Sequence, residues 1–357
     1  MAHASPLFDQ TTIATLTADR VIYRDLRPCE PGLPGIAELR AELCLPAGYL
    51  PRKRDRDYAR VVQQIAQAAQ AMRDGPPLGS CLVIGDTEND RVFACHLAEL
   101  GSLRTWGFIG TDQLAEPAWS QTDGIITKAN RWAALADWRK QVERTGIDWP
   151  TTVLLIDIDK TLLGPRGRTD RATDDSRAAG ALRVARDLFG PTLDAQVFRA
   201  LYDRLCRKEY HPFTLDNQDY VVYSALLIMG GALSIDDLDE NLTVGRLSSF
   251  AELLEATAAK LPAPLSELHS TIAERVAQGD PTPFKRFRHA ELEETIARMT
   301  DGRLTICREL IELASELAAR GALCMAASDK PAEASLPSPA QRAAGLLPLH
   351  WTTARLG

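Results

Sequence analysis

The order of apolar and polar positions predicts alternating strands and helices in the first half of the chain and again near its end. Short apolar runs bounded by turn residues are typical of buried strands, and apolar residues that recur every three or four positions are typical of amphipathic helices. Residues 17–26 could hold one short strand. The clearer strands are predicted at 82–84, 103–109, 153–156 and 322–327, and another short one is predicted at 123–127. The helices predicted beside them are 55–72, 92–100, 131–144 and 306–320.

The pattern changes after residue 163. From 164 to about 300 the spacing of apolar residues is helical throughout, without a convincing strand. Strand–helix alternation on both sides of a helical insertion is typical of a parallel α/β sheet that has a separate helical domain. We therefore predict a core formed by residues 1–163 and 301–357, with a helical domain at 164–300.

Composition narrows the range of functions. The formal net charge of -7, without a long run of Lys or Arg, argues against a nucleic-acid partner. No apolar stretch is long enough to cross a membrane, and the first residues lack the features of a signal peptide, so a cytoplasmic location is expected. The seven cysteines are scattered without CxxC pairs, which is typical of reduced thiols and makes a zinc site unlikely.

Two apolar runs end abruptly in carboxylates. They are VLLIDIDKT at 153–161 and LVIGDTEND at 82–90. A buried parallel strand places residues that follow it at the edge of the sheet, where they are available for chemistry. Alternate residues of an extended segment point the same way, so Asp157 and Asp159 can both face one site.

The first run resembles motif I, DxDxT, of the haloacid-dehalogenase-like (HAD) phosphohydrolases. The resemblance implies that Asp157 is a nucleophile that forms an aspartyl-phosphate and that Asp159 is the general acid and base. Thr161 matches the threonine that braces this loop at the phosphate. An aspartate in the place of Asp159 is found in the phosphatases and mutases of the superfamily and is absent from the dehalogenases.

The second run resembles motif IV, GDxxxD, of the same superfamily. The resemblance implies that Asp86 and Asp90 bind Mg²⁺ together with the Asp157 carboxylate and the backbone carbonyl of Asp159. Mg²⁺ prefers hard oxygen ligands and usually keeps several waters, so a few carboxylates and a phosphate suffice. Glu88, which lies between the two matched acids, has no counterpart in the motif.

The remaining motifs are shorter. Ser328, at the end of LCMAASDKP, resembles the serine of motif II, whose hydroxyl donates to a phosphate oxygen. Lys53 precedes the helix that leads into motif IV and so stands where the family has its motif III lysine. Lys330 is the rival for that role because it lies close to motif II, and we favour Lys53.

The motifs run in the order III, IV, I, insertion, II, which is the usual cycle of the superfamily opened between motifs II and III. The chain is thus identified as a circularly permuted HAD-like protein. The implied fold is a Rossmann-like, doubly wound parallel sheet with an inserted helical C1-type cap. Strand 82–84 should then lie beside 153–156, with 322–327 on the other side, all parallel.

The implied function is a Mg²⁺-dependent phosphatase that acts on a small phosphorylated metabolite. Two alternatives remain: a phosphotransferase or phosphomutase with the same chemistry, and a catalytically idle binding module. Two polar clusters of the helical domain could bind a phosphate or an acidic substrate, although solvated helix ends are the favoured interpretation of both. They are residues 207–211 and 285–289.

Overall fold

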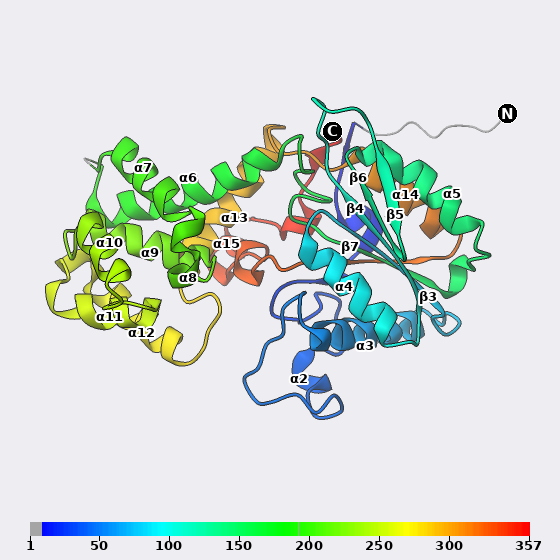
Figure 1. Ribbon diagram of the computed structural model, residues 1–357, viewed down its shortest axis with the longest axis horizontal. Coiled ribbons are helices and arrows are strands. Elements are labelled where there is room, and N and C mark those ends of the chain that lie inside the picture. Colours follow the sequence, from blue (N-terminus) through cyan, green and yellow to red (C-terminus); the bar gives the residue numbers. More distant parts are fainter. Residues whose placement is uncertain (1–8, 192) are drawn as a thin grey trace. The chain divides into compact units, whose positions relative to one another are not determined.

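The computed structural model describes residues 9–191 and 193–357, which fall into two compact units (Figure 1). The first contains the chain up to Asp174 and Thr295–Gly357, and the second contains Asp175–Glu294. The change from one unit to the other falls inside helices α6 (Asp170–Phe189) and α13 (Lys285–Thr300). The sequence pattern, by contrast, changes in the loops that precede α6 and follow α13.

The first unit is built around a seven-stranded sheet. All neighbouring strands are parallel except β5 and β6, which are antiparallel. The unit therefore has an α/β fold with a mostly parallel sheet, which confirms the fold class predicted from the strand–helix alternation. In spatial order the strands are β2 (Val21–Ile22), β8 (Leu323–Ala327), β7 (Thr152–Ile156), β3 (Ser80–Gly85), β4 (Arg104–Gly110), β6 (Ile126–Ala129) and β5 (Ser120–Asp123).

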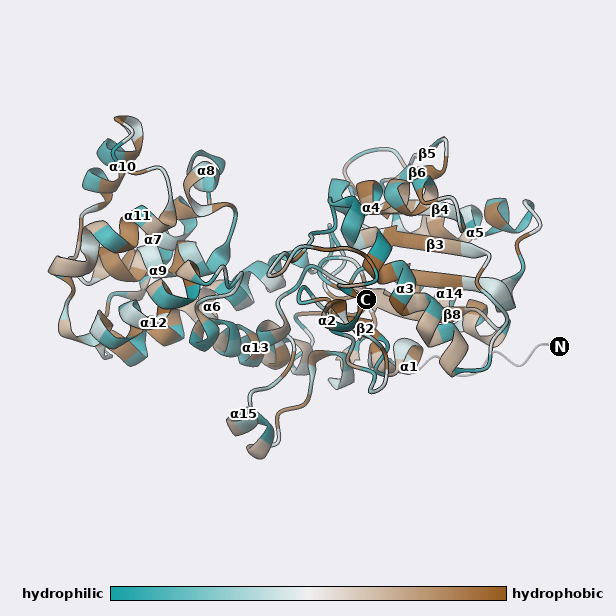
Figure 2. Ribbon diagram, turned by 90° about the horizontal axis from the view of Figure 1, so that it is seen from below, coloured by the Kyte–Doolittle hydropathy of each residue, from teal (hydrophilic) through white to brown (hydrophobic). Residues whose placement is uncertain are grey.

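The strands that precede the two carboxylate motifs are neighbours. Leu82 of β3 pairs with Leu154 of β7, and Leu154 in turn pairs with Cys324 of β8. The predicted placement of these three strands is thus confirmed. Every residue of β3, β7 and β8 is buried, and Figure 2 shows β3 and β8 as apolar ribbons. Apolar runs without alternation are expected where helices cover both faces of a sheet.

The strand predicted at 123–127 has the wrong bounds, because one strand ends at Asp123 and the next begins at Ile126. Those residues span the turn of a hairpin, in which β5 pairs antiparallel with β6. Gly124 lies in the turn with φ +56°, a backbone conformation that costs glycine little. All four residues of β5 are exposed, so this edge strand lacks the apolar pattern from which a strand is predicted.

Helices cover both faces of the sheet (Figure 1). One face packs against α3 (Arg56–Met72) and α4 (Glu88–Glu99), whose apolar side chains share a core with side chains of β3, β7 and β8. The other face is covered by α5 (Leu135–Glu143) and α14 (Arg308–Ala319), which contact one another. No helix in the described part of the chain is both long and apolar enough to cross a membrane.

Segments from the two ends of the described chain are joined. Strand β1 (Gln10–Thr11) pairs antiparallel with β9 (Ala354–Arg355). The buried ring of His350 lies between the Tyr23 hydroxyl, 3.2 Å from Nδ1, and Asp19, whose Oδ1 is 3.0 Å from Nε2. Three short helices of this unit are α1 (Ala14–Thr17), α2 (Ile36–Leu39) and α15 (Pro339–Ala343).

The second unit is helical. Its core surrounds α9, whose residues Val221–Leu227 are all buried, and includes a buried ion cluster in which Arg288 pairs with Asp219 and Glu291. Apart from its shares of α6 and α13, the unit contains α7 (Ala195–Leu205), α8 (His211–Thr214), α9 (Gln218–Met229), α10 (Ile235–Thr243), α11 (Phe250–Thr257) and α12 (Ser266–Ala277).

Candidate active site

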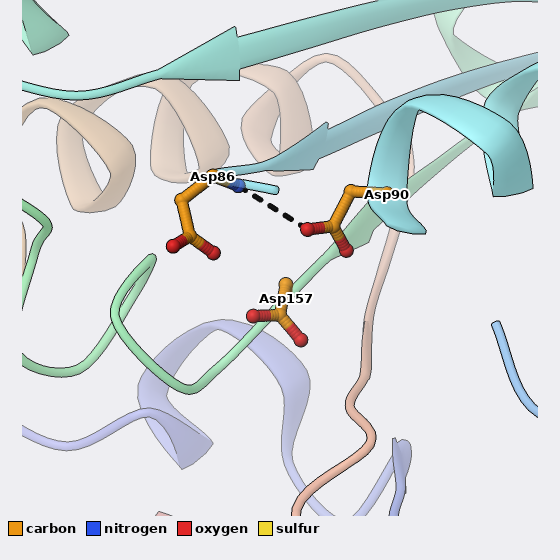
Figure 3. Close-up of side chains that lie close together, drawn as sticks. All are labelled: Asp86, Asp90 and Asp157. Atoms are coloured by element: carbon orange, nitrogen blue, oxygen red, sulfur yellow. Dashed lines mark hydrogen bonds between the residues drawn. The ribbon is translucent and has the colours of Figure 1, made fainter. Parts of the chain in front are cut away.

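Three aspartates converge at the carboxyl ends of two neighbouring strands. Asp86 directly follows β3 and Asp157 directly follows β7, while Asp90 lies in the first turn of α4 (Figure 3). Each offers a carboxylate oxygen, and these oxygens lie within 4.8 Å of one another. All three residues are buried. The parallel pairing of β3 with β7 is what brings these acids together from distant parts of the sequence.

Asp90 is held against the end of β3. Its Oδ2 accepts hydrogen bonds from the backbone N–H groups of Asp86 and Thr87 and from the Thr87 hydroxyl. A carboxylate in the first turn of a helix is also favoured by the helix dipole. Gly85 makes room for this arrangement, because a Cβ at that position would lie 2.2 Å from Cγ of Asp90.

The motif around Asp157 folds into a tight turn. The N–H of Leu162 donates to the carbonyl of Asp157, the N–H of Leu163 donates to that of Ile158, and Lys160 has φ +61°. Thr161 is fully buried in this turn, and its Oγ1 donates to Oδ1 of Asp86 at 2.9 Å. Thr161 thus fixes the position of Asp86 relative to the turn.

Lys53 bonds two of the three acids. Its Nζ donates to Oδ1 of Asp157 at 2.5 Å and to Oδ1 of Asp90 at 2.6 Å, and all three side chains are nearly inaccessible. Lys53, the lysine favoured over Lys330, thus lies against Asp157. Sequence reasoning places it before α3, and the structure brings this segment to the carboxyl end of β7.

Burial and charge shift the pKa values of these groups in different directions. Burial raises the pKa of Asp157, and the neighbouring charges of Asp90 and Asp86 add to the effect against the opposing charge of Lys53. Burial also raises the pKa of Asp86 to about 6, although Arg166 opposes it. The pKa of Asp90 is lowered despite burial, because Lys53 and Thr87 stabilise the carboxylate. Burial alone would lower the pKa of Lys53, but the charges of Asp157 and Asp90 raise it.

Arg166 pairs with the third acid, and sequence reasoning did not identify it. Its Nε donates to Oδ2 of Asp86, whose side chain is 1% exposed, while the side chain of Arg166 is 36% exposed. The available signal was a basic residue in the short GPRGR loop that follows the DIDKT motif. Two cations, Lys53 and Arg166, thus face three acids.

Two other predicted site residues, Asp159 and Ser328, follow strands β7 and β8. Asp159 is half-buried in the turn after β7, and its charge raises the pKa of Arg166, but it is not one of the three converging carboxylates. Ser328 directly follows β8, the strand beside β7, and is fully buried. Its backbone N–H donates to Ile22, and its Oγ accepts from the N–H of Lys330 at 3.3 Å.

The donors of the aspartate cluster suit a divalent cation. Asp86, Asp90 and Asp157 offer only carboxylate oxygens, the ligand type that Mg²⁺ prefers. With all three ionised and two cations beside them, one negative charge remains in a buried setting where uncompensated charge is costly. A bound divalent cation would change this net charge from -1 to +1, and the positive charge would allow a second anion to approach Asp157.

One candidate of the second unit is corrected. Arg288, in the cluster 285–289, is 3% exposed and is committed to Asp219 and Glu291, so it is neither a solvated helix end nor free to bind an anion. Three buried charges in contact satisfy each other, and such a network is hard to distinguish from a binding cluster by sequence alone.

Comparison of the chain with protein-family models, with curated proteins and with solved structures gave no match.

Proposed function

We propose that this chain is a Mg²⁺-dependent phosphatase that hydrolyses a small phosphate monoester through an aspartyl-phosphate on Asp157. The observation that supports the proposal best is the position of Asp157: it follows a central parallel strand, is bonded to Lys53 and is flanked by Asp86 and Asp90. A carboxylate held in this way can act as a nucleophile toward phosphorus, and the adjacent cations offset the negative charge of the incoming ester.

In the first half-reaction, an oxygen of Asp157 attacks phosphorus and the bond from phosphorus to the ester oxygen breaks. Asp159, in its protonated form, gives its proton to the departing oxygen, so the alcohol leaves neutral. Lys53 holds Asp157 in place, and the hydroxyl of Ser328, at the end of the adjacent strand, donates to an oxygen of the phosphoryl group.

In the second half-reaction, water attacks the phosphorus of the aspartyl-phosphate. Asp159, now a carboxylate, takes a proton from this water, and the bond between phosphorus and Asp157 breaks to release inorganic phosphate. Both aspartates are thereby returned to their starting states. When bound by Asp86, Asp90 and Asp157, Mg²⁺ would supply positive charge to the phosphoryl oxygens.

We further propose that the chain is a circularly permuted HAD-like protein with the second unit as its cap. Three features support this proposal. The matched residues occur in the cyclic order of the family, β3 lies beside β7, and a helical unit is inserted between β7 and β8, which are neighbours in the sheet.

The test is release of inorganic phosphate from a panel of phosphate monoesters by the purified chain, with and without Mg²⁺. We expect turnover that requires Mg²⁺ and disappears in Asp157→Asn. Adding an alcohol acceptor distinguishes hydrolysis from phosphotransfer, since a transferase would form a new ester in place of phosphate. If the purified chain hydrolyses no ester of the panel with Mg²⁺ present, the proposed phosphatase function is refuted.

A further inference from the structure

Arg166 is held rigidly through its backbone. Its N–H donates to the carbonyl of Lys160 at 2.8 Å, and its carbonyl accepts from the N–H of Asp112 at 2.9 Å and from Nε1 of the buried Trp132 at 3.2 Å. The next residue is Gly167, with φ +86°, where a Cβ would lie 1.9 Å from the carbonyl oxygen of Asp112. These contacts hold the backbone of the loop, and the bond from Nε to Asp86 holds the Arg166 side chain.

The guanidinium of Arg166 is only partly used. Its Nε is bonded to Asp86, but neither Nη1 nor Nη2 forms a hydrogen bond with any residue that the structure describes. Lys53, which bonds Asp90 and Asp157, is buried, whereas the side chain of Arg166 is about one-third exposed. Arg166 therefore joins the buried acids to the accessible part of the site.

This geometry suits a second anion on the substrate. The two Nη groups of arginine form a planar fork that matches a carboxylate or phosphate with two hydrogen bonds. The transferred phosphoryl group must approach buried Asp157, so the group nearer to solvent is the alcohol part of the ester. The negative charges of Asp159 and Asp170 also act on Arg166 and oppose the binding of an anion there. Binding of an anion is therefore favoured when a divalent cation balances the charge of the acids.

We infer that Arg166 determines specificity by binding a second anionic group, a carboxylate or a phosphate, on the leaving alcohol of the substrate. The inference rests on the proposed phosphatase function, and it narrows the substrate class to phosphate monoesters whose alcohol is itself an anion. Arg166 takes no part in bond breaking in this proposal; its role is to select and orient the ester.

The test is equilibrium binding to the Asp157→Asn variant in Mg²⁺, measured by titration calorimetry, with three probes on one two-carbon skeleton. Ethylene glycol monophosphate ends in a neutral hydroxyl, phosphoglycolate in a carboxylate and ethylene glycol bisphosphate in a phosphate. We expect one or both anionic probes to bind about 10-fold tighter than the neutral one, since a charge-assisted pair of hydrogen bonds is worth at least that factor. The stronger of the two anionic probes identifies the group.

Two substitutions in the Asp157→Asn background isolate Arg166. Arg166→Gln should reduce the ratio of affinities for the anionic and neutral probes to about one. Arg166→Lys, which keeps the charge but loses the planar pair of Nη donors, should keep part of this preference. Arg171→Gln is the matched control, because Arg171 is an exposed arginine nearby on α6 and its loss should leave the preference unchanged. Thermal unfolding of each variant verifies that it is folded.

The inference is overturned if no probe binds, if the three probes bind equally, or if Arg166→Gln weakens all three by the same factor. These outcomes are separate from failure of the proposed function, which is judged by phosphate release from the unsubstituted chain. If the chain hydrolyses no ester but its preference for anionic probes depends on Arg166, the anion site is supported and the proposed phosphatase function is refuted.

Discussion

Lys53 and Asp157, which are 104 positions apart in the sequence, form a buried ion pair with Nζ 2.5 Å from Oδ1. The same Nζ also bonds Asp90, so one lysine joins the turn before α3, the start of α4 and the end of β7. An ion pair this buried depends on its geometry, because the charges have lost their water and rely on these contacts for compensation.

Replacing Lys53 with Met should therefore destabilise the fold as well as abolish activity. Asp90 and Asp157 would be left buried without their cation, and breaking a buried pair from one side costs about 3 kcal/mol or more in the free energy of unfolding. Urea denaturation and phosphate release measure the two effects. Lys330→Met is the contrasting variant: retention of most activity there, with loss in Lys53→Met, would assign the motif III role to Lys53. The reverse result would reassign it to Lys330.

Asp157→Asn and Asp159→Asn should fail in different ways. The amide that replaces the Asp157 carboxylate cannot attack phosphorus, so no covalent intermediate should form. Asp159→Asn removes proton transfer from both half-reactions and should slow turnover by roughly 10²–10⁴-fold. Intact-mass spectrometry after rapid quenching measures the phosphorylated protein, which we expect in Asp159→Asn and not in Asp157→Asn. A phosphorylated Asp157→Asn chain would mean that another residue is the nucleophile.

Gly85→Ala should displace Asp90. The added Cβ would lie 2.2 Å from Cγ of Asp90, a distance that forces the carboxylate away from Lys53 and from the end of β3. We expect a loss of about 1–3 kcal/mol in stability, typical of overpacking, and a marked loss of activity. Gly79→Ala is the control, since its Cβ would meet only Oγ1 of Thr151 at 3.8 Å. Equal behaviour of the two variants would contradict the packing role of Gly85.

Asp86→Ala should weaken cation binding. The variant removes one of three converging carboxylates and leaves Arg166 without its partner, so the site becomes more positive and less attractive to a cation. Calorimetric titration with Mg²⁺ should show weaker binding, and excess Mg²⁺ should partly restore turnover. Asp157→Asn should not be restored in this way, because its defect is the missing nucleophile. Unchanged Mg²⁺ affinity in Asp86→Ala would place the cation elsewhere.

The contribution of His350 to the stability of the first unit should fall as the pH is lowered through about 6.5, the ordinary pKa of histidine. Burial lowers the pKa of His350, against the opposing effect of the hydrogen bond that the Asp19 carboxylate accepts, so the unfolded chain binds a proton at a higher pH than the folded chain. Stability then decreases with falling pH between these two pKa values. The urea midpoint measured from about pH 8 to pH 5 should fall less in His350→Gln than in the unsubstituted chain. Parallel curves would show that His350 does not contribute.

Much of the core was predictable from sequence because its signals are local. An apolar run such as 153–156 that ends in acids is enough to predict a buried strand with a reactive end, and α3 has a regular amphipathic pattern. The pairing of β7 with β3 and β8 was predictable only through the resemblance of the motifs. The HAD assignment, the cap and the residue roles stay predictions.

What sequence could not predict depends on contacts between distant residues. Arg166 has no periodic context, and its importance emerges only when β3 places Asp86 beside the loop. The cluster 285–289, which contains Arg288, is predicted to be a solvated helix end because nothing in the sequence shows that Asp219 faces Arg288. The exposed strand β5 lacked the apolar residues on which strand prediction relies.

The strand order has a consequence for the way this protein is made. Strand β8 lies between β2 and β7, yet it is synthesised after every other strand of the sheet and after the whole helical unit. Until the ribosome has released residues 323–327, β7 has an unpaired apolar edge and β2 has no partner in the sheet. Such edges are sites of aggregation in nascent chains. Residues 323–327 therefore join β2 to the rest of the sheet, and the edge of β7 needs protection from other chains until they emerge.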